Sequence, residues 1–205
     1  DKGSHTKSSF NTFIAWDSRD DRFDTTKGSL HSLSFEFAGL GGNVGFVKGI
    51  AATGWYFPLW RSFVGILHGR PGAMTEAFGK NIPDYEKFYL GGMNSLRGFD
   101  TEDLAPRDSA GLEMGGEKFL QFNAELKFPL LRELGVFGLL FLAGGPVYEE
   151  SGDWNSEHGF RFSAGPEFRW NSPMGPVRVA YGFILNPKDS DKRKGNFEFS
   201  MYSSF

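Results

Sequence analysis

Apolar and polar residues alternate with a period of two along nine stretches of the chain, as in β-strands that meet an apolar environment on one side. In residues 119–128, one face carries Leu120, Phe122, Ala124, Leu126 and Phe128, and the other carries Phe119, Gln121, Asn123, Glu125 and Lys127. Similar alternation, clear or weak, occurs in residues 9–17, 30–38, 44–57, 61–70, 135–148, 160–170, 177–185 and 196–205. The pattern predicts an all-β protein of about nine strands.

The segments between these stretches alternate in length. Short segments and long polar ones follow each other in turn at 58–60, 71–116, 129–134, 149–159, 171–176 and 186–195. Antiparallel transmembrane β-barrels of bacteria have such alternating periplasmic turns and outer loops. The alternation fails near the start, where 39–43 is short and 18–29 is long. Segment 71–116 is too long for an idle connection in a compact domain, so we expect it to enter the barrel lumen.

The composition favours a membrane wall over a water-soluble core. The chain has 23 Phe and 17% aromatic residues, yet its mean hydropathy is −0.34. A barrel combines these properties because it turns apolar side chains to lipid and polar ones to a wet lumen. No apolar run approaches the roughly 18 residues of a membrane-spanning helix.

A soluble β-sandwich is the alternative that the alternating pattern leaves open. Two observations weigh against it. The apolar faces of five strands would over-fill a small sandwich core. Aromatic residues also concentrate near the ends of the predicted strands, where interface girdles lie in membrane proteins, at Trp16, Trp55, Phe57, Trp60, Trp170, Tyr181 and Phe205.

Charge and reactive residues exclude several classes of function. The net charge of −3 and the lack of a basic stripe exclude a nucleic-acid partner. The chain has no cysteine, which excludes disulfide scaffolds and thiol chemistry. Its four histidines, His5, His31, His68 and His158, lack metal-ligand spacing, and it has no G-x-S-x-G motif. We expect no cofactor, metal site or catalytic residue, with a barrel enzyme that uses Ser, His and Asp as a remote alternative.

Within the long segment, residues 91–99 (GGMNSLRGF) combine loop-forming glycines with residues suited to burial. Leu96, Arg97, Gly98 and Phe99 form the centre of this motif. We expect Gly98 to allow close backbone approach or a positive φ.

An arginine inside a barrel has to be paired, because an isolated buried charge is very costly. Glu125 faces the lumen from residues 119–128 and is the expected partner of Arg97. Phe99 is expected to pack on Phe141 or Leu139. The alternative is an arginine that stays solvated on the loop.

Five motifs resemble, in the same order, those of the outer-membrane protein assembly insertases of the POTRA-transporter superfamily. They are FDTTKG at 23–28, YEKFYLGG at 85–92, LRGF at 96–99, NAELKFPL at 123–130 and SPMGPVR at 172–178. The resemblance covers nearly the whole chain and implies a transmembrane barrel of sixteen strands. Residues 1–205 would hold the last nine strands as a single domain. Because the polar N-terminus does not fit a signal peptide, we interpret the chain as a fragment without the POTRA domains and N-terminal strands.

The resemblance also implies that acidic residues on two strands hold the loop arginine. One is Glu125, paired with Arg97, and the other is an Asp in an F-x-D-x-G motif. Residues 141–145 start that motif with Phe141 but carry Ala143 at the position of the Asp. Glu167, which faces the lumen one strand further on, is the candidate to replace it.

The last predicted strand carries an outward apolar ladder of Phe197, Phe199, Met201 and Phe205. This ladder resembles the targeting signal of barrel proteins, and in the family the last strand forms half of a lateral gate with the first. A weakly paired seam could open and offer its edge to an incoming strand. The simpler interpretation is that these residues only face lipid.

The resemblance implies a factor that folds and inserts β-barrel proteins into the outer membrane of Gram-negative bacteria, without covalent chemistry. Its partners would be nascent outer-membrane proteins, accessory assembly lipoproteins bound through the POTRA domains, and outer-membrane lipid and lipopolysaccharide. The open edges of a nine-strand fragment would also allow edge-to-edge self-association. The alternatives are a two-partner-secretion or autotransporter-assembly translocase of the same superfamily, and a small porin-like barrel.

Overall fold

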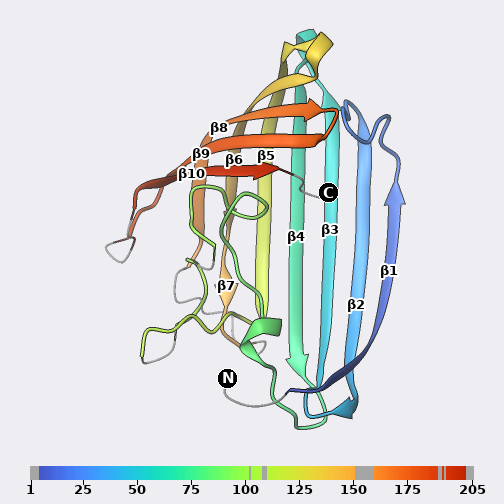
Figure 1. The fold of residues 1–205 in the computed structure, drawn as a ribbon, viewed down its shortest axis with the longest axis vertical. Helices are drawn as coiled ribbons and strands as arrows, with labels where there is room; N and C mark the ends of the chain where they lie inside the picture. Colours follow the sequence, from blue (N-terminus) through green and yellow to red (C-terminus); the bar gives the residue numbers. More distant parts are fainter. Residues whose placement is uncertain are drawn as a thin grey trace.

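A single antiparallel sheet of ten strands makes up the fold in the computed structural model (Figure 1). The structure describes residues 5–101, 103–107, 110–150, 159–188, 191 and 193–201. The strands are β1 (Lys7–Asp17), β2 (Gly28–Gly42), β3 (Phe46–Pro58), β4 (Val64–Glu76), β5 (Lys118–Leu131), β6 (Val136–Gly145), β7 (Val147–Tyr148), β8 (Arg161–Ser172), β9 (Gly175–Ile184) and β10 (Gly195–Met201). Short 3-10 turns occur at η1 (Trp60–Ser62), η2 (Asp84–Glu86) and η3 (Arg132–Leu134). Each predicted stretch contains a strand, so the all-β antiparallel prediction is confirmed.

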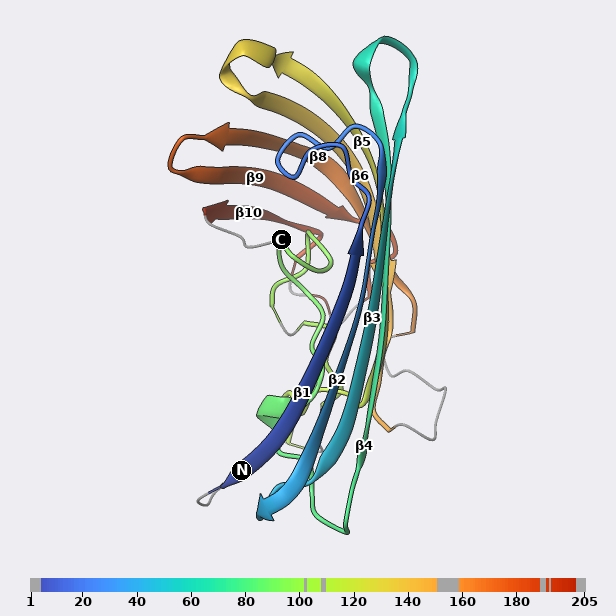
Figure 2. The same cartoon turned by 90° about the vertical axis from the view of Figure 1, so that its right-hand side faces the viewer.

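Strands that follow each other in the chain are neighbours in the sheet, except that the short β7 pairs with β5 beyond the end of β6. The order places β1 and β10 at the two edges. The sheet curls, and the long connection between β4 and β5 lies on its concave side (Figure 2). Among the described residues, no helix has the length and apolarity needed to cross a membrane.

The two faces of the sheet are inverted relative to those of a soluble protein. Charged and amide side chains on the concave face are buried, with Glu167 at 3% and Gln121 at 5% exposure. On the convex face, Phe197 is 62% and Leu140 53% exposed. Burial of such a side chain away from water stabilises a fold by about 1.5–3 kcal/mol, so this face needs lipid. The sandwich alternative, which would bury these residues between sheets, is wrong.

The strand ends differ from the predicted ones in three places. Strand β2 runs through the predicted turn 39–43 to Gly42, and β4 continues to Glu76 inside the predicted loop. The predicted strand 135–148 is divided at Pro146, which has no backbone N–H for a ladder. The predicted last strand is described as far as Met201, and Phe205 lies outside the described residues.

Candidate functional site

Residues 77–117 form what we call the inner loop, and the described part of this loop lies on the concave side of the curled sheet (Figure 2). Backbone hydrogen bonds tie Phe88 and Gly116 together in both directions, at 2.8 and 2.9 Å. Apolar side chains of the loop and of the wall form one buried cluster, which includes Leu90, Leu96, Phe99 and Leu104 of the loop and Phe119, Phe141, Ala143, Val147 and Ala180 of the wall. The loop is therefore packed as part of the core.

A tight turn presents the arginine of the loop motif to the wall. The N–H of Gly92 donates to the carbonyl of Phe99 at 2.8 Å, and the N–H of Ser95 donates to the carbonyl of Gly92 at 3.0 Å. Gly92 has φ +85°, a conformation that a glycine adopts without the steric cost of a Cβ. The turn places Leu96 and Arg97 toward the sheet, where both are buried.

Arg97 bridges two strands of the wall. Its exposure is 2%, and it donates through Nη2 to Oε1 of Glu125 on β5 and through Nη1 to Oε2 of Glu167 on β8. Its guanidinium carbon also lies 4.0 Å from the ring centroid of Phe141 on β6. We call Arg97, Glu125 and Glu167, with Arg169 and Arg178, the clamp. The interpretation of Arg97 as a solvated loop residue is wrong.

Glu167 is the centre of this clamp. Arg178 of β9 donates to both of its carboxylate oxygens, at 2.8 and 3.1 Å, and Arg169 donates to Oε1 at 2.8 Å. Arg169 also lies 3.7 Å from Glu125. Three guanidinium groups and two carboxylates thus form one network, in which removal of a carboxylate would leave buried cations without their partner.

The position of the absent Asp is occupied by Ala143, which is fully buried on β6. Ala143 pairs with Asn123 on one side and Ser163 on the other, so neither neighbour brings a carboxylate there. The second carboxylate bound by Arg97 is Glu167, one strand further, as the sequence suggested.

Arg169 and Arg178 were not identified as site residues from the sequence. Their positions already carried a signal, because both occupy lumen-facing places in predicted strands 160–170 and 177–185. Two buried carboxylates around one arginine would carry a net negative charge, so further cations had to be near.

Gly98 and Phe99 continue the contact toward the end of the chain. Gly98 has φ +95°, and its N–H donates to Oε1 of Glu198 on β10 at 2.6 Å. A Cβ at Gly98 would fall 2.8 Å from the carbonyl oxygen of Gly182 on β9. Both the predicted positive φ and the predicted close approach are therefore present.

Phe99 is buried and belongs to the same cluster as Phe141. The cation nearest to its ring is Arg161, whose guanidinium carbon lies 5.0 Å from the ring centroid. Arg161 in turn donates from Nη2 to Oδ2 of Asp191 at 2.5 Å. The guanidinium of Arg97 contacts the face of Phe141. A cation therefore lies over each of the two rings, Phe99 and Phe141.

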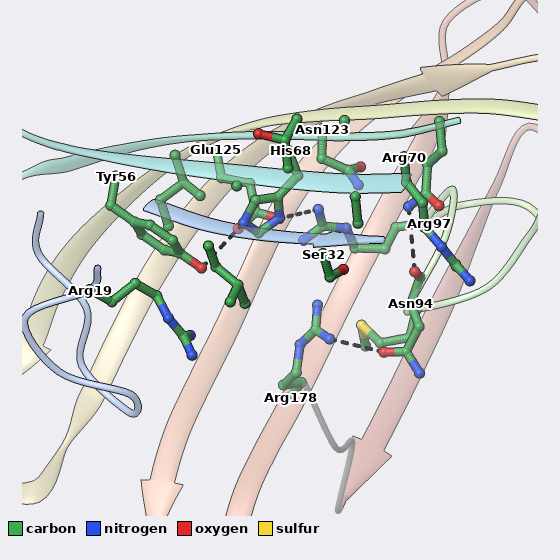
Figure 3. Close-up of a pocket in the computed structure, with 18 of the residues that line it drawn as sticks. Arg19, Ser32, Tyr56, His68, Arg70, Asn94, Arg97, Asn123, Glu125 and Arg178 are labelled. Atoms are coloured by element: carbon green, nitrogen blue, oxygen red, sulfur yellow. Dashed lines mark hydrogen bonds and ion pairs between the residues drawn. The ribbon is translucent and has the colours of Figure 1, made fainter. Parts of the chain in front are cut away.

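A polar cavity of about 480 Å³ lies beside the clamp. Figure 3 shows His68 directed toward Tyr56, and Arg178 directed toward Asn94 of the inner loop. The ring Nε2 of His68 is 3.3 Å from the hydroxyl oxygen of Tyr56, and Nη1 of Arg178 donates to Oδ1 of Asn94 at 3.2 Å. Among the described residues, no group of three His, Cys, Asp or Glu side chains could hold a metal ion.

The predicted ladder on the last strand faces outward as far as the structure describes it. Phe197, Phe199 and Met201 of β10 are exposed on the convex side. Glu198, between the first two, points the other way and contacts the inner loop.

An outward apolar wall, a charged concave face and a loop packed inside the curl define part of a transmembrane β-barrel of the bacterial outer-membrane type. The chain belongs to the Omp85 superfamily, whose domain model matches residues 1–205. The family resemblance that the motifs indicated is confirmed.

The chain is similar to outer-membrane assembly factors of several bacteria. "Outer membrane protein assembly factor BamA" of Nitratidesulfovibrio vulgaris is 36% identical over 195 residues, which cover 92% of this chain and 24% of that protein. The protein of the same name from Neisseria meningitidis serogroup B is 29% identical over 212 residues, which cover 88% of this chain and 26% of that protein. The chain thus spans about a quarter of the length of these relatives. The crystal structure of BamA from Haemophilus ducreyi lacking POTRA domains 1-3 shares the fold, with a TM-score of 0.77 and 21% identity over 94% of this chain and 42% of that one.

Proposed function

We propose that this chain is the barrel portion of an outer-membrane protein assembly factor, located in the outer membrane of a Gram-negative bacterium. The relatives that carry this name match nearly all of the chain. In this proposal the chain forms one transmembrane domain, and POTRA domains and further strands belong to the rest of the protein. Nascent outer-membrane proteins are its substrates, accessory assembly lipoproteins bind through the POTRA domains, and lipid and lipopolysaccharide surround it.

The observation that carries the proposal is the position of β10 at an edge of the sheet. An edge strand offers a row of backbone N–H and C=O groups to which another strand can add by β-augmentation. Folding by strand addition needs no covalent step. Each added strand gains from its neighbour the backbone hydrogen bonds that lipid cannot provide. β10 would then be half of a lateral gate.

In this proposal the bilayer thins beside a short seam at the gate, which lowers the cost of inserting a new strand next to β10.

A disulfide across the gate tests this function. The chain has no cysteine, so a cysteine in β10 can be paired with one in the strand that closes the barrel of the complete protein. We expect oxidised cells to stop assembling outer-membrane proteins and to resume after reduction. As the control, Phe199→Cys with Val179→Cys joins β10 to β9, which are already paired in the sheet. Normal assembly with the gate disulfide formed would refute the gate.

A further inference from the structure

The inner loop contacts the terminal strand directly, in addition to the clamp. The N–H of Gly98 donates to Oε1 of Glu198 at 2.6 Å. Two residues later on the loop and two residues earlier on β10, Nδ2 of Asn196 donates to Oδ1 of Asp100. Two residues of β10 therefore bind two residues of the loop, in a contact separated by about a hundred residues of sequence.

The backbone of β9 forms the floor of this contact. In the ladder between β9 and β10, Gly182 lies opposite Asn196, and Ala180 lies opposite Glu198. A Cβ at Gly182 would be 2.5 Å from the Cα of Gly98, so loop and strand backbones lie against each other here. The loop thus lies beside the last ladder of the sheet, within hydrogen-bonding distance of Asn196 and Glu198.

Glu198 is held on one side only. Its Oε1 accepts the hydrogen bond from Gly98, whereas Oε2 is buried without a hydrogen-bond partner in the described part of the chain. A buried carboxylate with half of its hydrogen-bonding capacity unused is costly. The contact of Glu198 with the loop therefore depends on the single hydrogen bond from the N–H of Gly98.

We propose that Glu198 is a positioning residue that holds β10 to the inner loop, so that the seating of the loop decides whether the terminal strand is fixed or free. Arg97 joins the loop to β5 and β8, and its neighbour Gly98 joins it to β10. A shift of the loop that withdraws Gly98 would leave β10 held mainly by its ladder with β9 and so loosen it, while the β8–β9 wall stays intact. This inference deepens the proposed function and rests on it for its biological meaning.

Hydrogen–deuterium exchange of the protein in lipid nanodiscs tests this contact without any substrate. Loss of a hydrogen bond to a charged group should speed the exchange of the β10 amides that donate to β9 by about ten- to a hundred-fold in Glu198→Ala. Glu198→Gln keeps an acceptor oxygen and should restore the slow exchange of these amides. Ser200→Ala, two residues along on the same face of β10, is the control and should leave the exchange unchanged. Wild-type exchange in Glu198→Ala, or equally fast exchange in Ser200→Ala, would overturn the proposal.

A pair of glycine variants tests the loop side of the contact. Gly98→Ala should push the loop off Gly182 and speed β10 exchange as Glu198→Ala does, because its Cβ would fall 2.8 Å from backbone. Gly111→Ala is matched to it, since Gly111 lies in the same loop with φ +81° and open space around its Cβ. Equal effects of the two variants on β10 would contradict a specific contact.

The exchange experiment tests the contact and the gate disulfide tests the function, so either can be refuted without the other. Slow β10 exchange that depends on Glu198 supports the contact even if the oxidised gate leaves assembly intact, which would refute the function alone. Blocked assembly with β10 exchange independent of Glu198 would refute the contact alone.

Discussion

Glu167 and Glu125 differ in how many arginines depend on them. Glu167 accepts hydrogen bonds from Arg97, Arg169 and Arg178, whereas Glu125 accepts one from Arg97 and has Arg169 at 3.7 Å. Because the uncompensated charge left by a lost partner sets the cost of a broken buried pair, the two carboxylates are unequal. Glu167, which takes the place of the absent Asp, is therefore expected to contribute more than Glu125 to holding the loop.

We therefore expect Glu167→Gln to loosen the inner loop more than Glu125→Gln. Removal of a partner from a buried ion pair costs roughly 3–5 kcal/mol. Glu167→Gln takes a charged partner from Arg97, Arg169 and Arg178, whereas Glu125→Gln leaves all three arginines bound to Glu167. Limited trypsin digestion reports the loosening, because Lys87 and Arg107 lie on the loop.

The control for the two clamp variants is Glu113→Gln. Glu113 pairs with Arg107 at 3.2 Å on the same loop, with both side chains partly exposed. An exposed pair contributes about 0–1 kcal/mol, so this variant should be cleaved after Lys87 at the wild-type rate. Cleavage of Glu167→Gln no faster than that of Glu113→Gln would show that the clamp does not hold the loop.

The contact of Arg97 could be anticipated at this scale because burial of a charge demands a partner, and Glu125 was the nearest lumen-facing carboxylate in the sequence. The contact of Gly98 with Glu198 could not. It joins a loop backbone to a strand about a hundred residues away, and a period of two tells which face Glu198 occupies but not which loop residue lies over it.

At the scale of elements, the turn between β1 and β2 is organised by Asp20. Its carboxylate accepts hydrogen bonds from the backbone N–H of Thr26 at 2.9 Å and of Lys27 at 3.1 Å, and from the Thr26 hydroxyl. The turn also reaches across to β5, where Nζ of Lys127 lies 2.7 Å from both Oδ1 of Asp24 and the carbonyl oxygen of Thr25. These contacts explain why this connection is longer than the other turns on its side.

The stability of this turn should depend on pH through Asp20. Desolvation alone would raise the pKa of Asp20, but the hydrogen bonds from Thr26 and Lys27 outweigh it and lower the pKa well below its usual value. A group with a lowered folded-state pKa stabilises the fold above its unfolded pKa of about 3.9, and this contribution disappears as the pH falls through the lowered value. Wild type should therefore melt at a higher temperature than Asp20→Ala at pH 7, and the difference should shrink toward pH 2.

Thermal unfolding of both forms in detergent at the two pH values measures this difference. Glu133→Ala removes an exposed carboxylate from turn η3 and should change the melting temperature little at either pH. A difference between wild type and Asp20→Ala that is the same at pH 2 and pH 7 would contradict the role of the carboxylate.

The elements themselves were predicted where hydrophobic alternation is strict, as in β5 and β8, because one face of each meets lipid along its length. Their ends were predicted less well, since hydrogen bonding to a neighbour can extend a strand through residues with no alternation. Strand β2 continues through glycines to Gly42 for this reason, paired with β1. The division at Pro146 depends on the pairing of Val147 and Tyr148 with β5, which no local pattern specifies.

At the scale of the whole molecule, the sheet has two open edges, and β1 is the less protected of them. Phe13 and Ile14 are consecutive and so point to opposite faces of β1, yet they are 68% and 65% exposed. A strand whose outer face meets lipid still needs cover on its inner face and a partner for its free backbone groups, because lipid provides neither. In the longer protein that we propose, further strands next to β1 would supply both.

The isolated chain in detergent should therefore pair edge to edge with a second copy, with a mass of about twice 22.9 kDa. Proline substitutions at Phe13 and, separately, at Ile14 test the contact, since neighbouring N–H groups of a strand point to opposite sides. One of them removes a bond to β2 and the other removes a bond at the free edge. The edge variant alone should give a monomer that keeps its thermal stability, and the other should lose stability. A wild-type mass near 22.9 kDa by light scattering would show that the backbone groups of the edges are hydrogen-bonded within one chain. The edge of β10 would then be closed in this form, whereas gate opening requires it to be free.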